Sequence, residues 1–215
     1  MRPIVYGLDA DMAQTIDDFH VDWPRLVTVG KAATKDDFPY LNAIAQYTNY
    51  CIEPFGIFAH SFHFQDDPQF DRVLNLVHAL PFVEQQFIPR LLARTNAMQA
   101  LGEFAQDFGT LEEALQKVKF TCINPFLLTG MLADYLFRYG MYSYFYKEHT
   151  ANDARDLALS LVEATLGSDL EQIIAFQAQG PWGAWFDPHS CTDRTFLLLQ
   201  KVRRKFWLFC FSHSD

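Results

Sequence analysis

The chain has 215 residues, of which 50% are apolar and 20% are charged, and its formal net charge is −9. These values are typical of a folded globular protein and exclude a largely disordered chain, because disorder requires low hydrophobicity. An acidic surface repels phosphate backbones, so the composition argues against nucleic acid as the partner. The length favours one domain that spans residues 1–215.

Aromatic residues are unusually frequent, with 21 Phe, 9 Tyr and 4 Trp. Each buried ring removes roughly 150–250 Å² from water, so we expect a core that is rich in ring contacts. An aromatic-lined pocket for an apolar small molecule is the alternative interpretation.

Cysteines and apolar runs indicate the compartment. Cys51, Cys122, Cys191 and Cys210 form no CxxC pair, and the first residues lack the apolar region of a signal peptide. The longest apolar run, 125–146, contains Asp134 and Arg138, which are four residues apart as in a helical ion pair. A membrane span disfavours such central charges. The pattern therefore predicts a cytoplasmic protein with free thiols and no membrane contact.

Capping residues, prolines and glycines divide most of the chain into predicted helices. Asp67 followed by Pro68 is a clear N-cap, Pro89 interrupts the longer helix after Pro81, and Gly167 is a good helix terminator. The predicted helices are 10–20, Thr34 to near Pro54, 68–80, 81–101, 110–117, 124–146, 150–167 and 168–180.

The pattern changes after Gly180. Residues 195–200 and 206–212 are rich in Leu, aromatic and β-branched residues, and the basic stretch 201–205 separates them, which predicts a β-hairpin. Both faces of each strand are apolar, and a lone hairpin is marginally stable in water. The hairpin must therefore be covered by helices, by a partner, or by a third strand from Ile4–Leu8 or Ala184–Phe186.

The predicted fold class is α+β, mostly α. A helical body at about 9–180 forms a bundle around the central apolar helix Asn124–Tyr146, and the hairpin element occupies about 183–213. The predicted core contains the following inward-facing residues: Phe87, Leu91, Leu127, Leu128, Met131, Leu132, Tyr135, Leu136, Leu161, Ile173, Leu198 and Leu208.

His60, His63 and Asp67 form the first candidate site. Two histidines three residues apart share one face if the segment is helical, and His nitrogens with carboxylate oxygens are typical ligands of zinc or iron. A divalent metal and a metal-assisted enzyme follow from this interpretation, and acid–base catalysis by the HxxxD spacing is a variant of it. The alternative is that Asp67 caps a helix and the histidines are structural.

A second candidate cluster joins the last predicted helix to the hairpin. His189 and Cys191 lie close in sequence, and pairing of the hairpin strands would bring Asp193 and His213 near them. Such a set could bind a metal or supply a Cys nucleophile with a His base. The alternative is turn chemistry at Asp187-Pro188 and Thr192-Asp193.

The sequence contains no phosphate loop, dinucleotide fingerprint, GxSxG elbow or CxxC…CxxC zinc site. Our leading hypothesis is therefore a cytoplasmic binding or regulatory protein that docks on another macromolecule, for example as an inhibitor of another protein or as the immunity partner of a basic toxin. Its acidity and its aromatic anchors favour protein–protein contact. The sequence gives no oligomeric state.

Overall fold

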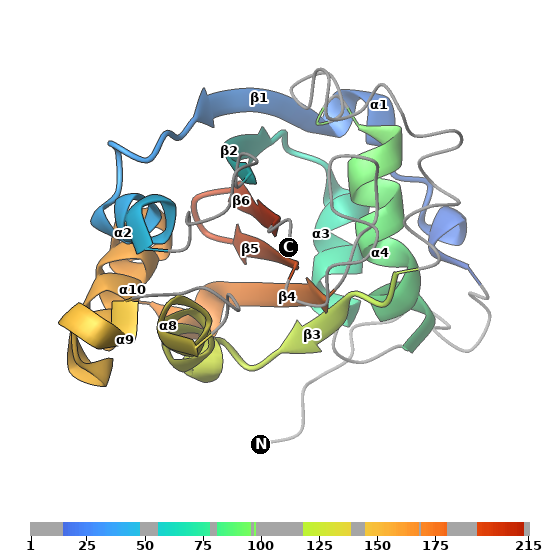
Figure 1. Ribbon diagram of the computed structural model, residues 1–215. Coiled ribbons are helices and arrows are strands. Elements are labelled where there is room, and N and C mark those ends of the chain that lie inside the picture. Colours follow the sequence, from blue (N-terminus) through green and yellow to red (C-terminus); the bar gives the residue numbers. More distant parts are fainter. Residues whose placement is uncertain are drawn as a thin grey trace.

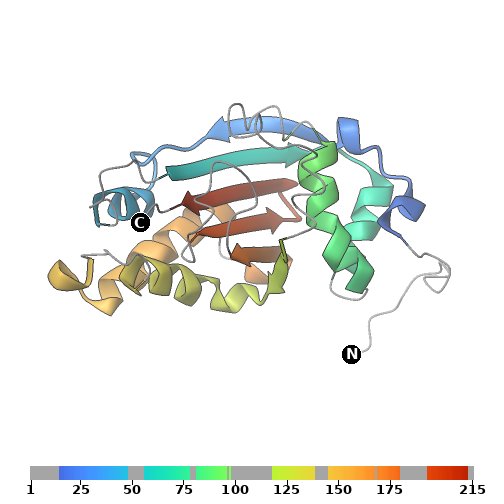
Figure 2. The ribbon, with the colours of Figure 1, turned by 45° about the vertical axis from the view of Figure 1, so that its right-hand side comes forward.

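The computed structural model describes residues 15–47, 56–77, 81–95, 97, 118–138, 145–167, 169–179 and 193–212. Six strands form one antiparallel sheet in the order β1-β2-β6-β5-β4-β3, which Figure 2 shows from blue β1 to yellow-green β3. The strands are β1 (Val27–Ala32), β2 (Gly56–Phe64), β3 (Thr121–Ile123), β4 (Ile173–Gln179), β5 (Arg194–Gln200) and β6 (Lys205–Ser212).

Helices cover both faces of the sheet (Figure 1). On one face lie the 3-10 helix η1 (Ile16–Phe19), α1 (Trp23–Leu26), α3 (Pro68–Leu76) and α4 (Pro81–Arg94). On the other face lie α2 (Pro39–Tyr47), α8 (Leu128–Arg138), α9 (Phe145–Glu148) and α10 (Ala151–Leu166). Two further 3-10 helices, η2 (Pro125–Leu127) and η3 (Leu170–Gln172), precede α8 and β4.

The alternation of side chains along the strands creates two separate cores. In β6, for example, Phe206 and Leu208 pack against α3 and α4, whereas Trp207 and Phe209 pack against the helices of the other face. The aromatic residues fill these layers, with stacked pairs such as Phe62–Phe206 at 4.5 Å between ring centroids. The sheet is therefore the middle layer of three.

The prediction of a mostly α helical bundle is wrong, because a six-stranded sheet separates two helical layers in the described part of the chain. The predicted helix at 168–180 contains strand β4, and the segment considered as a helix around His60 is strand β2. Strands buried on both faces lack a clear polar–apolar alternation, so their residues resemble those of a buried helix.

The predicted hairpin is confirmed. β5 and β6 pair from Arg194 with Phe211 to Gln200 with Lys205, and β2 and β4 flank them on either side. The possible third strands at 4–8 and 184–186 lie outside the described residues, as does the predicted helix at 110–117.

Several helix caps follow the sequence closely. The side chain of Asp67 accepts bonds from the backbone N–H groups of Gln69 and Phe70, and Thr150 with Asp153 forms a capping box at the start of α10. Of the predicted core, Leu127 is wrong, because 59% of its surface is exposed, and Met131 is half-buried. The other ten predicted core residues are buried.

Candidate docking site at the β3 edge

The structure separates the residues of the first predicted site. His60 and His63 lie on β2, where a spacing of three places them on opposite faces of the sheet. His60 is buried between the rings of Phe58 and Phe62, with Nδ1 at 3.0 Å from the carbonyl oxygen of Ser61, whereas His63 is exposed.

Asp67 serves as the N-cap of α3. Across the described residues, no group of three or more His, Cys, Asp or Glu side chains is arranged to hold a metal ion. The prediction of metal binding at His60, His63 and Asp67 is therefore wrong, because the helical periodicity on which it depended does not apply to a strand.

One member of the second predicted cluster, Asp193, lies within the described residues. It is fully buried, and the hydroxyl of Ser212 donates to its Oδ2 at 3.5 Å, the long limit of a hydrogen bond. His189, Cys191 and His213 lie outside the described residues, so this cluster stays a prediction.

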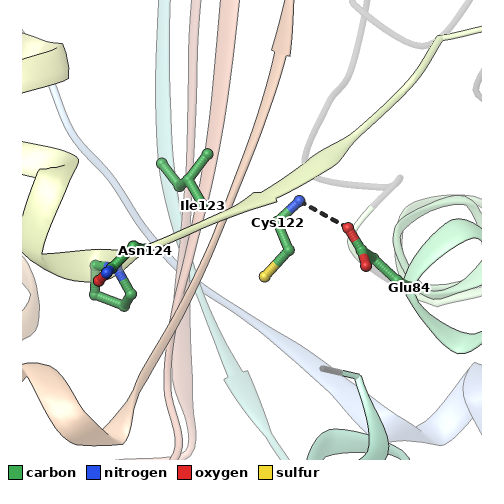
Figure 3. A pocket seen from close by; sticks show the side chains of 5 residues that line it. Glu84, Cys122, Ile123 and Asn124 are labelled. Carbon is green, nitrogen blue, oxygen red and sulfur yellow. Dashed lines mark hydrogen bonds between the residues drawn. The ribbon is translucent and has the colours of Figure 1, made fainter. Parts of the chain in front are cut away.

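A solvent-open groove of about 440 Å³ lies at the β3 edge of the sheet. It is lined by Glu84, Cys122, Ile123, Asn124 and Pro125 (Figure 3). The side chains of Cys122 and Ile123 point to opposite sides of the strand, while Glu84 approaches from α4. The groove thus wraps around the edge strand, and its volume is within the range of small-ligand pockets.

Local sequence explains how the groove forms. The carbonyl and side-chain oxygens of Asn124 accept bonds from Leu127 N–H and Phe126 N–H, and Pro125 begins η2 directly after β3. This turn redirects the chain from the sheet edge into α8. Glu84 lies in the first turn of α4, where the helix dipole favours a negative charge.

Glu84 also accepts a hydrogen bond from the outer backbone edge of β3. The backbone N–H of Cys122 points away from β4 and donates to Glu84 Oε1 at 3.2 Å (Figure 3). An unpaired N–H on an edge strand is a template for pairing with another chain, and this carboxylate occupies it. The groove therefore suits side-chain recognition better than addition of a further strand at Cys122.

The charge of Glu84 affects its neighbour. Burial raises the pKa of the Cys122 thiol to about 11, and the negative charge of Glu84 adds to that increase. Glu84 has no ion-pair partner among the described residues, and its hydrogen bond there is the one from Cys122. The groove therefore contains a half-buried carboxylate that no described residue pairs with a positive charge.

Two exposed apolar residues lie directly beyond the groove. Phe126 is 67% exposed and Leu127 is 59% exposed. The 3-10 helix η3 packs against η2, which contains these two residues. Two exposed acidic residues belong to the same region: Asp169 directly before η3 and Glu171 within it. Single exposed apolar residues are common, but two adjacent ones beside a groove form a patch. We call the groove and these two residues the β3-edge site.

Sequence patterns alone do not identify the β3-edge site. The apolar run 125–146 has the composition of one continuous helix, and such a helix would place Leu127 in the core. The Asn124-Pro125 cap was the available signal, since it puts Phe126 and Leu127 in a turn before the buried stripe of α8 begins at Leu128. Glu84 has no sequence signal, because only the fold brings α4 beside β3.

The predicted aromatic-lined pocket has no counterpart in the β3-edge groove, because none of the described residues that line it is aromatic. A second groove of about 330 Å³ lies along α4 and is lined by Gln85, Gln86, Pro89 and Arg90. The apolar-ligand interpretation thus stays a prediction. No helix in the described ranges combines the length and apolarity required to span a bilayer.

No family model matches the chain, and no curated protein matches it. Among solved structures, a crystal structure of citrus MAF1 matches 84% of this chain and 96% of its own, with 12% sequence identity and a TM-score of 0.46.

Proposed function

We propose that this protein acts in the cytoplasm as a binding or regulatory protein and docks on another protein through the β3-edge site. One observation carries the proposal: Phe126 and Leu127 are adjacent, largely exposed, and lie beside a groove that contains a half-buried carboxylate. Aromatic and aliphatic anchors beside a pocket are characteristic of binding hot spots.

The acidity of the chain favours a basic partner. With a net charge of −9, the protein attracts a positively charged surface over several ångströms, which speeds encounter and selects against acidic partners and nucleic acid. An inhibitor that covers the basic active site of its target is one form that this function would take.

A cytoplasmic location is part of the proposal. Cys122 and Cys210 are free thiols in the structure, and Cys210 is completely buried within the sheet. Free buried thiols agree with a reducing compartment, where disulfides are rare.

Affinity capture from the native host, with the full chain as bait, tests the proposal. The wild-type chain should retain one stoichiometric partner, and the double variant Phe126→Ser, Leu127→Ser should lose it. Both substitutions lie on exposed positions, so the variant should keep its fold, which circular dichroism and the melting temperature check. The captured partner, once identified and purified, should cross-link to residues of the β3-edge site.

Val29→Thr is the matched control. Val29 is 44% exposed and lies on β1, the opposite edge strand of the sheet, so its substitution should leave capture unchanged. Absence of a stoichiometric partner, or equal capture by the wild-type chain and the folded double variant, would overturn the proposal.

A further inference from the structure

The carboxylate of Glu84 is the chemically most specific feature of the β3-edge site. One oxygen, Oε1, accepts the Cys122 N–H at 3.2 Å, and the second oxygen, Oε2, has no hydrogen bond within the described residues. The side chain is half-buried and lies in the wall of the open groove. In the free protein, water that enters the groove can solvate Oε2.

Docking would change this situation. A partner that covers the groove removes water from Glu84, and an ionised carboxylate that loses its water without gaining a counter-charge is strongly destabilised. A partner with an apolar or acidic side chain at this point would therefore bind poorly. A partner with a cation there would form a charge-assisted hydrogen bond in a water-poor setting.

The walls of the groove suit a long basic side chain. Ile123 and Pro125 supply apolar surface that can pack against methylene groups, while Glu84 receives the charged end. Neither Lys119, the exposed lysine before β3, nor any other described residue forms an ion pair with Glu84, so within the described part of the chain the carboxylate is open to an external cation. We propose that the groove binds a lysine or arginine side chain of the partner protein, with Glu84 as its counter-ion.

This inference rests on the proposed function for its biological meaning, but it can be tested without the partner. The probes are N-acetyl-arginine methylamide, the equivalent lysine amide, and N-acetyl-citrulline methylamide, which has the shape of arginine without its charge. The backbone amide resonance of Cys122 in ¹⁵N-labelled full-length protein reports binding, because this N–H bonds to Glu84. Saturable shifts of the Cys122 and Ile123 amides are expected with the arginine and lysine amides.

The citrulline amide should bind roughly tenfold or more weakly, because it lacks the charge-assisted bond. Glu84→Gln should reduce arginine binding by a similar factor, while its amide oxygen still accepts the Cys122 N–H and preserves the local structure. Lys119→Ala is the matched control and should bind the cationic amides at least as tightly as the wild-type chain. Added salt should weaken binding of the arginine amide.

Equal binding of the arginine and citrulline amides, full binding by a folded Glu84→Gln variant, or the lack of a saturable shift with either cation would each overturn the inference. These outcomes are separate from failure of the proposed function. If cations do not bind but the Phe126 and Leu127 substitutions abolish partner capture, the proposed docking function is supported and the proposed recognition of a basic side chain by Glu84 is wrong. If cations bind but no partner is captured, the groove binds cations and the proposal that the protein docks on another protein is wrong.

Discussion

Gly30 lies directly against Ser61 where the edge strand β1 pairs with β2. A Cβ atom at Gly30 would lie 2.6 Å from both the carbonyl oxygen and the hydroxyl oxygen of Ser61. The β1–β2 pairing shifts register between Val29 and Ala32, as at a β-bulge. There the Ser61 hydroxyl replaces backbone pairing, because it accepts a hydrogen bond from Lys31 N–H and donates one to the Lys31 carbonyl. The absence of a side chain at residue 30 therefore permits the close pairing of β1.

Gly30→Ala should consequently destabilise the protein. Rotation of the Ser61 side chain can relieve one contact, but the backbone carbonyl cannot move without shifting β2. We expect a loss of about 1–3 kcal/mol in the free energy of unfolding, measured by urea denaturation. Gly130→Ala is the matched control, because nothing lies within 4 Å of its Cβ position in α8. It should stabilise the protein by about 0.5–1 kcal/mol, and an equal loss in both variants would contradict the steric explanation.

Asp67 should act through helix capping and not through a metal. Asp67→Ala should lower the free energy of unfolding by about 0.5–2 kcal/mol, since two N–H groups of α3 lose their acceptor. Asp67→Asn should retain most of the stability because Asn is also a strong N-cap residue. Addition of zinc should leave the melting temperature of the wild-type chain unchanged. A zinc-dependent increase that disappears in Asp67→Ala would instead establish a metal site there.

Local signals predicted the parts of the fold that depend on a few neighbouring residues. The Asp67 and Thr150 caps, the Gly167 terminus of α10 and the β5–β6 hairpin all follow from short-range patterns. The face on which a side chain lies depends instead on the correct choice between helix and strand. His60 and His63 would be neighbours on a helix but lie on opposite sides of β2. The predicted metal site depended on the helical side-chain period of about 3.6 residues, and it is lost with the strand period of two residues.

The β3-edge site depends on contacts between distant segments, which a single sequence does not contain. Glu84 and Cys122 are 38 residues apart and meet only because α4 packs beside the edge of the sheet. Phe126 and Leu127 have the composition of core residues, and only the turn after Asn124 leaves them exposed. The sequence alone therefore favoured a docking protein from its composition but could not locate the surface.

Asp37 should make the stability of the protein depend on pH in the acid range. Hydrogen bonds from Lys31 and from the backbone and hydroxyl of Thr34 lower the pKa of Asp37 from 3.8 to about 2. A group whose pKa is lower in the folded state stabilises the protein above its unfolded pKa, and this stabilisation is lost as the pH falls toward the folded pKa. The contribution of Asp37 should thus be complete above about pH 4 and should decrease from there to about pH 2.

Urea denaturation at pH values from 5 to about 2 measures this contribution. Asp37→Asn should be less stable than the wild-type chain at pH 5, and the two stabilities should converge as the pH falls to about 2. Lys31→Met should remove part of the difference, because the bonds from Thr34 remain. A stability gap that stays constant across this range would show that Asp37 acts through packing and not through its charge.

The reactivity of Cys122 should report the charge of Glu84. Because thiolate is the reactive form and the pKa of Cys122 is about 11, alkylation by iodoacetamide at pH 8.5 should be slow. Glu84→Gln removes a negative charge that raises this pKa, so the thiolate fraction and the alkylation rate of Cys122 should increase. Peptide mapping by mass spectrometry separates the signal of Cys122 from that of the other cysteines.

Two controls distinguish this electrostatic effect from loosening of the fold. Burial raises the pKa of the Cys210 thiol, and this residue is inaccessible, so it should stay unmodified in every folded variant. Glu171→Gln removes an exposed carboxylate from η3 and should leave the rate at Cys122 unchanged. Faster alkylation of both Cys122 and Cys210 in Glu84→Gln would indicate local unfolding. An unchanged rate at Cys122 would mean that Glu84 does not carry its negative charge beside the thiol, and the cation site proposed at the β3 edge would lose its basis.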